Sequence, residues 1–219
     1  MKVRDGLSSE QDAFRQGFLF LLIGLLPLLL VYPVLAGSSQ FSLPVLILFL
    51  SFLLVTGVWV MRGARHRFLL SGILCLVSLE LLWVSIWAAA PQLLIIGQFC
   101  VLLFLILLLG WSVAAFLRFE SVVSDLFIAM AVLYLLSGTV LGFSLFLFDS
   151  STTAVQTGPG GSLLASGLFS GIAILTLQGG SISGQDPLTR VIIMLGMLWG
   201  ILLLVMSISR ITLIMLKKG

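Results

Sequence analysis

The sequence predicts an all-α integral membrane protein with six transmembrane helices and a re-entrant helix and loop between the fifth and the sixth. Apolar residues make up 60% of the 219 residues and charged residues only 9%, which excludes the surface of a soluble protein. The apolar residues gather in runs long enough to cross a bilayer, and basic residues recur in alternate connectors. One further apolar run is too short to cross and leads into a glycine-rich segment.

Six runs reach the length of about 20 residues that a helix needs to span the hydrocarbon core. They lie at 17–36, 43–61, 68–89, 93–117, 123–148 and 187–213. Pro27 is expected to kink the first helix, because proline removes one backbone donor. The segment before the first run carries three acidic residues, unlike a signal peptide, so this run is interpreted as a true span.

The basic residues predict which connectors face the cytoplasm. Ten of the eleven Lys and Arg residues lie before the first run or near the far ends of the second, fourth and sixth, and only Arg190 is assigned outside. Because cytoplasmic connectors carry the excess of Lys and Arg, both termini are predicted to be cytoplasmic. The expected location is the plasma membrane, which is the inner membrane in bacteria. The lipid bilayer is therefore the first predicted partner.

The segment between the fifth and sixth runs differs from the other connectors. Residues 149–161 are polar and glycine-rich and predict an exposed turret. Ser162 is a candidate N-cap for a short apolar helix over 162–175, and about 20 Å of helix cannot cross. Because unpaired peptide groups cannot face acyl chains, the loop at 176–181 must be buried in protein or line water. A re-entrant loop is one interpretation, and a loop resting on the membrane surface is the other.

Several residues of this region occur at a recognisable spacing. They are Phe169-Ser170 within the short helix, Thr176, Gly180, Ile182, and the Pro187-Leu188-x-Arg190 sequence that opens the last run. In this register, residues 118–213 resemble the pore module of prokaryotic potassium-channel-type ion channels, in which a two-helix pore domain follows four helices.

The resemblance implies a four-helix N-terminal domain at 1–117 and a pore domain at 118–219. The pore domain would consist of an outer helix at 123–148, a pore helix at 162–175, a filter-like loop at 176–181 and an inner helix at 187–213. It also implies a homotetramer, because one pore loop surrounds only a quarter of an axis.

The predicted ion filter departs from the family sequence TVGYG. It reads Thr176-Leu177-Gln178-Gly179-Gly180, so Gln178 replaces a glycine that lets the backbone turn its carbonyls inward. The stretch also resembles the filter of bacterial sodium channels, but too few residues follow it for their second pore helix. The permeant ions are expected to be monovalent cations, K⁺ or Na⁺, with weak selectivity, and no other cofactor is predicted.

Residues on either side of the filter have predicted roles at the outer mouth and the gate. Ser181, Asp186 and Arg190 are assigned to the outer mouth, where Asp186 also suits the N-cap position ahead of Pro187. Gly200 is a candidate hinge of the inner helix. With Gly196 it forms a GxxxG pair, for which close helix packing is the alternative.

Glu80 is the only acid deep inside a predicted span, and an intramembrane carboxylate is costly enough to be a functional candidate. It is expected to be protonated or hydrogen-bonded, toward Gln98 or Trp83. The fourth run contains no Lys or Arg, so the N-terminal domain lacks a charged voltage-sensor helix.

No enzyme, metal site or nucleic-acid partner is predicted. The single histidine, His66, lies in a connector, so neither a His and Cys metal cluster nor an intramembrane Ser and His pair can form. The basic residues indicate topology rather than a binding patch.

Three functions stay open: a weakly selective tetrameric cation channel, a non-conducting accessory subunit of a larger membrane complex, and a secondary transporter. Transporters usually show internal repeats that this chain lacks.

Overall fold

The computed structural model describes residues 15–31, 42–61, 65–87, 91–118, 123–152, 160–176 and 187–218, and these segments are helical nearly throughout. Four of the helices contain stretches long and apolar enough to cross a membrane. These are His66–Ser85, Gln92–Leu117, Asp125–Phe148 and Pro187–Leu213. The chain is therefore an all-α membrane protein, as the sequence predicts.

The first two predicted spans are shorter in the described part of the chain. The first helix, Arg15–Val31, ends in a π-helix, η1 (Pro27–Val31), and α3 covers Ser42–Val60. The irregular turn begins at Pro27, the residue whose missing N–H interrupts the hydrogen-bond ladder. The apolar parts of both helices have at most 17 residues, the lower end of the range for a span. That these two helices also cross the membrane, which would make six crossings in all, stays a prediction.

The remaining helices follow the predicted order, with small changes at their ends. They are α4 (Arg65–Trp87), α5 (Pro91–Arg118), α6 (Val123–Thr152), α7 (Gly160–Leu175) and α8 (Pro187–Lys218). The helix α7 begins two residues before Ser162, so Ser162 lies in the first turn and is not the N-cap. The helices α6 and α8 continue beyond residues 148 and 213, because a helix does not need apolar residues once it leaves the hydrocarbon.

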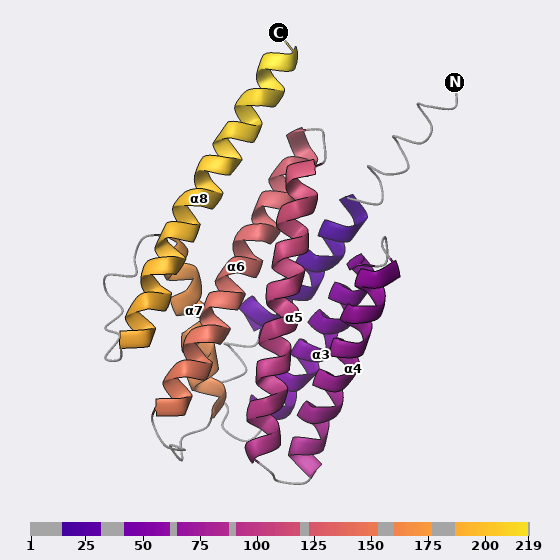
Figure 1. The fold of residues 1–219 in the computed structure, drawn as a ribbon, viewed down its shortest axis with the longest axis vertical. Coiled ribbons are helices and arrows are strands. Elements are labelled where there is room, and N and C mark those ends of the chain that lie inside the picture. Colours follow the sequence, from indigo (N-terminus) through magenta and orange to yellow (C-terminus); the bar gives the residue numbers. More distant parts are fainter. Residues whose placement is uncertain are drawn as a thin grey trace.

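The helix segments that carry basic residues lie toward one end of the molecule. We call it the basic end and define it by Arg15, Arg65, Arg67, Arg118 and Arg210. Contacts between the helices establish it. The Arg15 side chain lies 3.6 Å from the Asp125 carboxylate at the start of α6. Arg210 of α8 bonds to the last carbonyls of α5. Figure 1 shows that α8 begins toward the opposite end of the molecule and runs toward the basic end.

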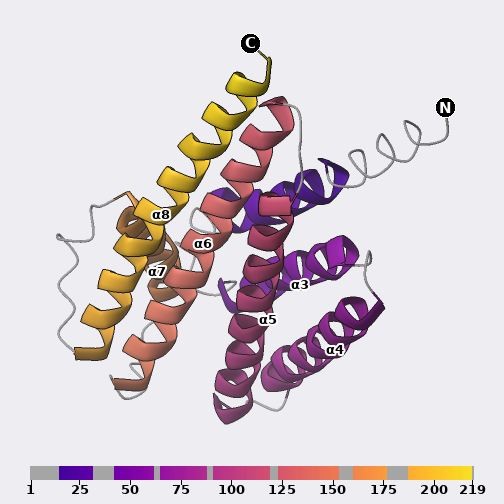
Figure 2. The same cartoon turned by 45° about the horizontal axis from the view of Figure 1, so that its top comes forward.

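The order of packing separates α4 from α8. The helix α4 packs on α5, α5 packs on α6, and α6 packs on both α7 and α8. In both views α4 and α8 lie on opposite sides of the molecule with α5 and α6 between them (Figures 1 and 2). One buried apolar cluster extends from Phe18 to Leu168 and crosses the predicted domain boundary after residue 117.

Candidate functional site

The short helix α7 lies against α6 with backbone touching backbone. Gly138 and Gly142 of α6 face Gly167 and Gly171 of α7, and a Cβ on Gly142 would lie 2.5 Å from the Gly167 carbonyl oxygen. Only glycine permits this approach, in the way that small residues bring membrane helices together. The two GxxxG pairs therefore fix the position of α7 along α6.

The other side of α7 packs on a third glycine pair, in α8. A Cβ on Gly200 would lie 2.5 Å from the Leu175 carbonyl oxygen, and a Cβ on Gly196 would lie 2.7 Å from Cγ2 of Ile174. Gly196 and Gly200 thus allow close helix packing, which was the alternative interpretation of this GxxxG pair. Bending of α8 at Gly200 stays a prediction.

These contacts define the depth at which α7 ends. Gly200 lies thirteen residues after Pro187, the first residue of α8, which corresponds to about 20 Å of helix. Gly138 lies fifteen residues after Val123 in the 30-residue helix α6, near its midpoint. The C-terminal end of α7 therefore lies beside the middle of both long helices.

Thr176 is the one residue of the predicted filter that the structure describes. It is exposed, its hydroxyl donates to the Ala173 carbonyl at 2.8 Å, and its N–H donates to the Ile172 carbonyl at 3.3 Å. It thus follows directly on the C-terminus of α7, where the unpaired carbonyls of a helix carry a partial negative charge. Outside the described residues lie Leu177, Gln178, Gly179, Gly180, Ser181 and Asp186.

Two hydrogen bonds attach α8 to the rest of the bundle. The Trp199 indole Nε1–H donates to Ser137 Oγ of α6 at 3.0 Å, next to the Gly200 contact. Near the basic end, the Arg210 guanidinium donates to the carbonyls of Phe116, at 3.3 Å, and Leu117. Arg210 thereby satisfies carbonyls that α5 leaves unpaired at its C-terminus. Neither contact was expected, because nothing in the local sequence indicates which distant helix will lie opposite.

Glu80 does not bond to the partners that the sequence suggested for it. The side chain is exposed on α4, whereas Gln98 is buried with 5% of its surface accessible. Within the described part of the chain, Glu80 makes no hydrogen bond to Gln98, to Trp83 or to any other residue. The expected bond to Gln98 is wrong because Gln98 faces the bundle interior while Glu80 faces away from it, and Trp83 shares the face of Glu80 without bonding to it. A charged side chain that faces lipid without a partner is costly.

Exposed apolar residues surround Glu80 on the same face of α4. They are Ile73, Leu76, Val77, Trp83, Val84 and Trp87. The two tryptophans lie toward the end of α4 opposite the basic end, a position typical of tryptophan at a membrane interface. Glu80 lies seven residues before Trp87, about 10 Å deeper.

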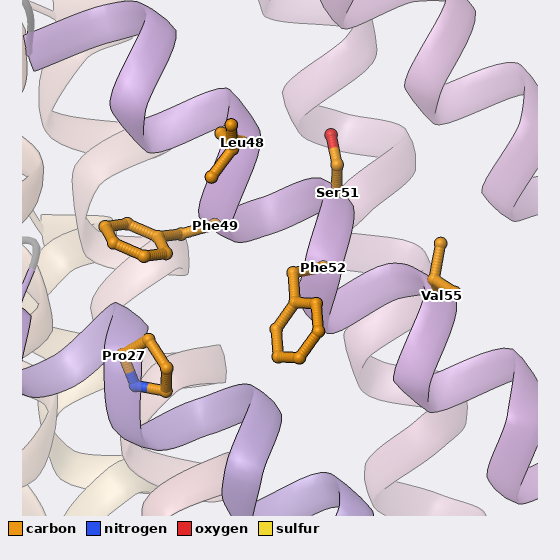
Figure 3. Close-up of a pocket in the computed structure, with 6 residues that line it drawn as sticks. All are labelled: Pro27, Leu48, Phe49, Ser51, Phe52 and Val55. Carbon is orange, nitrogen blue, oxygen red and sulfur yellow. The ribbon is translucent and has the colours of Figure 1, made fainter.

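An apolar groove of about 470 Å³ lies between the first helix and α3. Figure 3 shows the side chains that line it, with Pro27 facing Phe49 and Phe52 of α3. Its one polar residue, Ser51, donates its hydroxyl to the Ile47 carbonyl at 2.6 Å. The groove therefore offers no polar group for a specific ligand.

The described residues contain no group of three or more His, Cys, Asp and Glu side chains that could hold a metal ion. Comparison of the chain with protein-family models, with curated proteins and with solved structures found no match.

Proposed function

We propose that this chain is one subunit of a tetrameric cation channel of potassium-channel type, weakly selective among monovalent cations. It would function in the plasma membrane with both termini in the cytoplasm. The observation that carries the proposal is the depth of α7, whose last residue, Leu175, contacts Gly200 in the middle of α8.

This depth supports a re-entrant pore loop over a loop on the membrane surface. The helix α7 ends about 20 Å along α8 from Pro187, where α8 begins. A chain that connects these two points within a membrane needs protein or water for its peptide groups. Where water fills this role beside a membrane-spanning helix, it would begin an ion pathway.

The electrostatics of α7 favour cations at this point. The C-terminus of a helix carries about half a negative charge, concentrated on its unpaired carbonyls. In a fourfold assembly, four such termini would converge near the axis, and each would present an exposed Thr176. The sum of these partial charges attracts cations and repels anions.

The filter sequence favours one alternative function. Gln178 and Gly179 stand where the family has a glycine and an aromatic residue. Gln178 breaks the alternating backbone that a potassium filter requires, and Gly179 lacks the ring that braces it. A subunit that keeps the pore fold but does not conduct would tolerate this sequence. Its four loops would leave no continuous water path.

Ion flux from liposomes tests the proposal. The unaltered protein should conduct K⁺ and Na⁺ at similar rates, and Gln178→Gly combined with Gly179→Tyr should shift the flux toward K⁺. The reason is that glycine restores inward-facing carbonyls and tyrosine braces them from behind. Strong K⁺ selectivity of the unaltered protein, or a preference for anions, contradicts the proposed filter. Absence of flux from both proteins, although each is tetrameric, favours the non-conducting subunit.

A further inference from the structure

We propose that neighbouring copies of this chain bind each other through Glu80 of α4 on one copy and Arg190 of α8 on the next. The inference rests on the proposed tetramer and adds the surface by which it assembles. It starts from two exposed, oppositely charged side chains that a single chain cannot bring together.

Within one chain, Glu80 and Arg190 are far apart. The helix α4 packs on α5, and α8 packs on α6 and α7. Figures 1 and 2 show α4 and α8 on opposite sides of the molecule with α5 and α6 between them. A contact between the two side chains therefore requires a second copy.

Both charges lie toward the end of the molecule opposite the basic end. Glu80 is seven residues before Trp87, and Arg190 is three residues after Pro187. These positions are about 10 Å and about 5 Å from the respective helix ends. With the two helix ends at one level, the charges differ in depth by about 5 Å, which an extended arginine side chain bridges. Two copies with the same orientation in the membrane can thus form the pair.

The surroundings of each charge are apolar and exposed. Arg190 is flanked on α8 by Leu188, Val191 and Met194, which have 63%, 51% and 65% of their surface accessible. Next to Glu80 on α4 lie Leu76 and Trp83, with 62% and 41% accessible. Packing these two faces together would bury apolar side chains around a single ion pair.

Charge complementarity identifies the occupant of the α4 face as a second copy. Among the described residues, Arg190 is the only Lys or Arg away from the basic end, and Glu80 is the only acid on the exposed membrane face of α4. Lipid tails offer no charge to a carboxylate at this depth. The guanidinium group has five N–H donors, so Arg190 can bind Glu80 while it keeps contacts within its own chain.

The symmetry of such a contact matches a ring. The face of α4 meets a different face, that of α8, so the interface is heterologous and repeats from copy to copy. Where successive copies are related by a rotation of 90°, the ring closes after four copies. A contact of α4 with α4 would give a twofold dimer instead.

Cysteine cross-linking in membranes tests the pair. In a background with Cys75→Ala and Cys100→Ala, Glu80→Cys and Arg190→Cys in the same chain should yield a ladder up to the tetramer with a short bismaleimide. Each single cysteine variant is the control and should give monomer. Dimers from Glu80→Cys alone would overturn the proposal, since they show α4 facing α4. The absence of cross-links would also overturn the proposal if native mass spectrometry finds the protein tetrameric. A monomer in native mass spectrometry would refute the proposed tetramer as well.

Charge reversal provides the second measurement. Glu80→Arg should lower the tetramer association constant about tenfold for each of the four contacts in the ring, the effect of a polar membrane contact worth between 1 and 2 kcal/mol, and Glu80→Arg with Arg190→Glu should restore it. Glu80→Gln tests the pair without adding a charge and should weaken association to a smaller extent. If both Glu80→Gln and Glu80→Arg leave the association constant unchanged, the proposal is overturned. It is also overturned if a helix of another protein, and not a second copy of this chain, shields the cysteine of Glu80→Cys from labelling.

Discussion

At the scale of single residues, six glycines decide where α7 lies. They form three GxxxG pairs, one in each of α6, α7 and α8: Gly138 and Gly142, Gly167 and Gly171, and Gly196 and Gly200. Their neighbours across the contacts are largely backbone atoms, which cannot move aside as the end of a side chain can. Gly72 and Gly110, by contrast, have no atom within 4 Å of an added Cβ, so these two glycines differ from the six in what a methyl group would do.

Gly171→Ala should destabilise the protein by about 1–3 kcal/mol, the usual effect of inserting a methyl group into a packed interior. The new Cβ would overlap the Gly138 carbonyl oxygen and the Gly142 nitrogen. Gly72→Ala is the matched control, because a Cβ at Gly72 meets no atom within 4 Å, and it should change stability by less than about 1 kcal/mol. Unfolding in detergent, followed by circular dichroism, measures both. Equal stability of the two variants would show that α7 does not pack on α6 in this way.

At the scale of elements, α8 is attached to the bundle along one narrow stripe. Ile193, Gly196, Gly200 and Leu203 are its buried residues, and most other positions are exposed. This arrangement suits an inner helix that lines water or contacts a neighbouring subunit on its free faces. The hydrogen bond from Trp199 to Ser137 lies on the attached side and joins α8 to α6.

Trp199→Phe should weaken the attachment of α8 by about 0.6 kcal/mol, the average for polar contacts between membrane helices. Phenylalanine keeps an aromatic ring but lacks the indole N–H donor. A double-mutant cycle with Ser137→Ala isolates the hydrogen bond from the change in packing. If the two substitutions add without coupling, the bond does not contribute to stability.

The helix α5 determines how the proposed channel responds to voltage. Its stretch long and apolar enough to cross a membrane, Gln92–Leu117, contains no Lys or Arg. Moving one charge through 100 mV provides about 2.3 kcal/mol, so a helix without charge gains nothing from the field. We expect a conductance that changes only shallowly with voltage in planar bilayers. An e-fold rise within a few millivolts would contradict this expectation.

At the scale of the whole molecule, the basic end combines a sequence pattern with tertiary contacts. The positive residues in alternate connectors predict one cytoplasmic side. The ion pair of Arg15 with Asp125 and the contact of Arg210 with α5 place distant helix ends together there. Pattern and packing agree on which ends share a side.

Labelling of introduced cysteines measures the orientation of the molecule in the membrane. Cysteines at Ser39 and Thr157 should react with an impermeant maleimide from outside intact cells. One at Ala64 should react only after the membrane is permeabilised, because it lies among Arg62, Arg65 and Arg67. Reaction of the Ala64→Cys variant from outside would invert the predicted topology.

The sequence by itself determined that this protein lies in a membrane, which segments form its long helices, and the grouping of its basic residues at alternate helix ends. These properties follow from transfer free energies that add residue by residue along a run, so they require no knowledge of neighbours. The last four predicted spans accordingly coincide with the four long apolar helices. The change from α-helix to π-helix at Pro27 also follows from one residue, because a missing backbone N–H is a local fact.

Only the tertiary structure decided the depth of α7, the partner of Arg210 and the side of α4 on which Glu80 lies. Each depends on which faces of distant helices meet. The GxxxG pair of Gly196 and Gly200 illustrates the difference: its spacing is visible in the sequence, but its contact with Leu175 is not. Glycine patterns permit close approach without naming the partner, because every small residue presents the same surface. Packing among all the helices makes that choice.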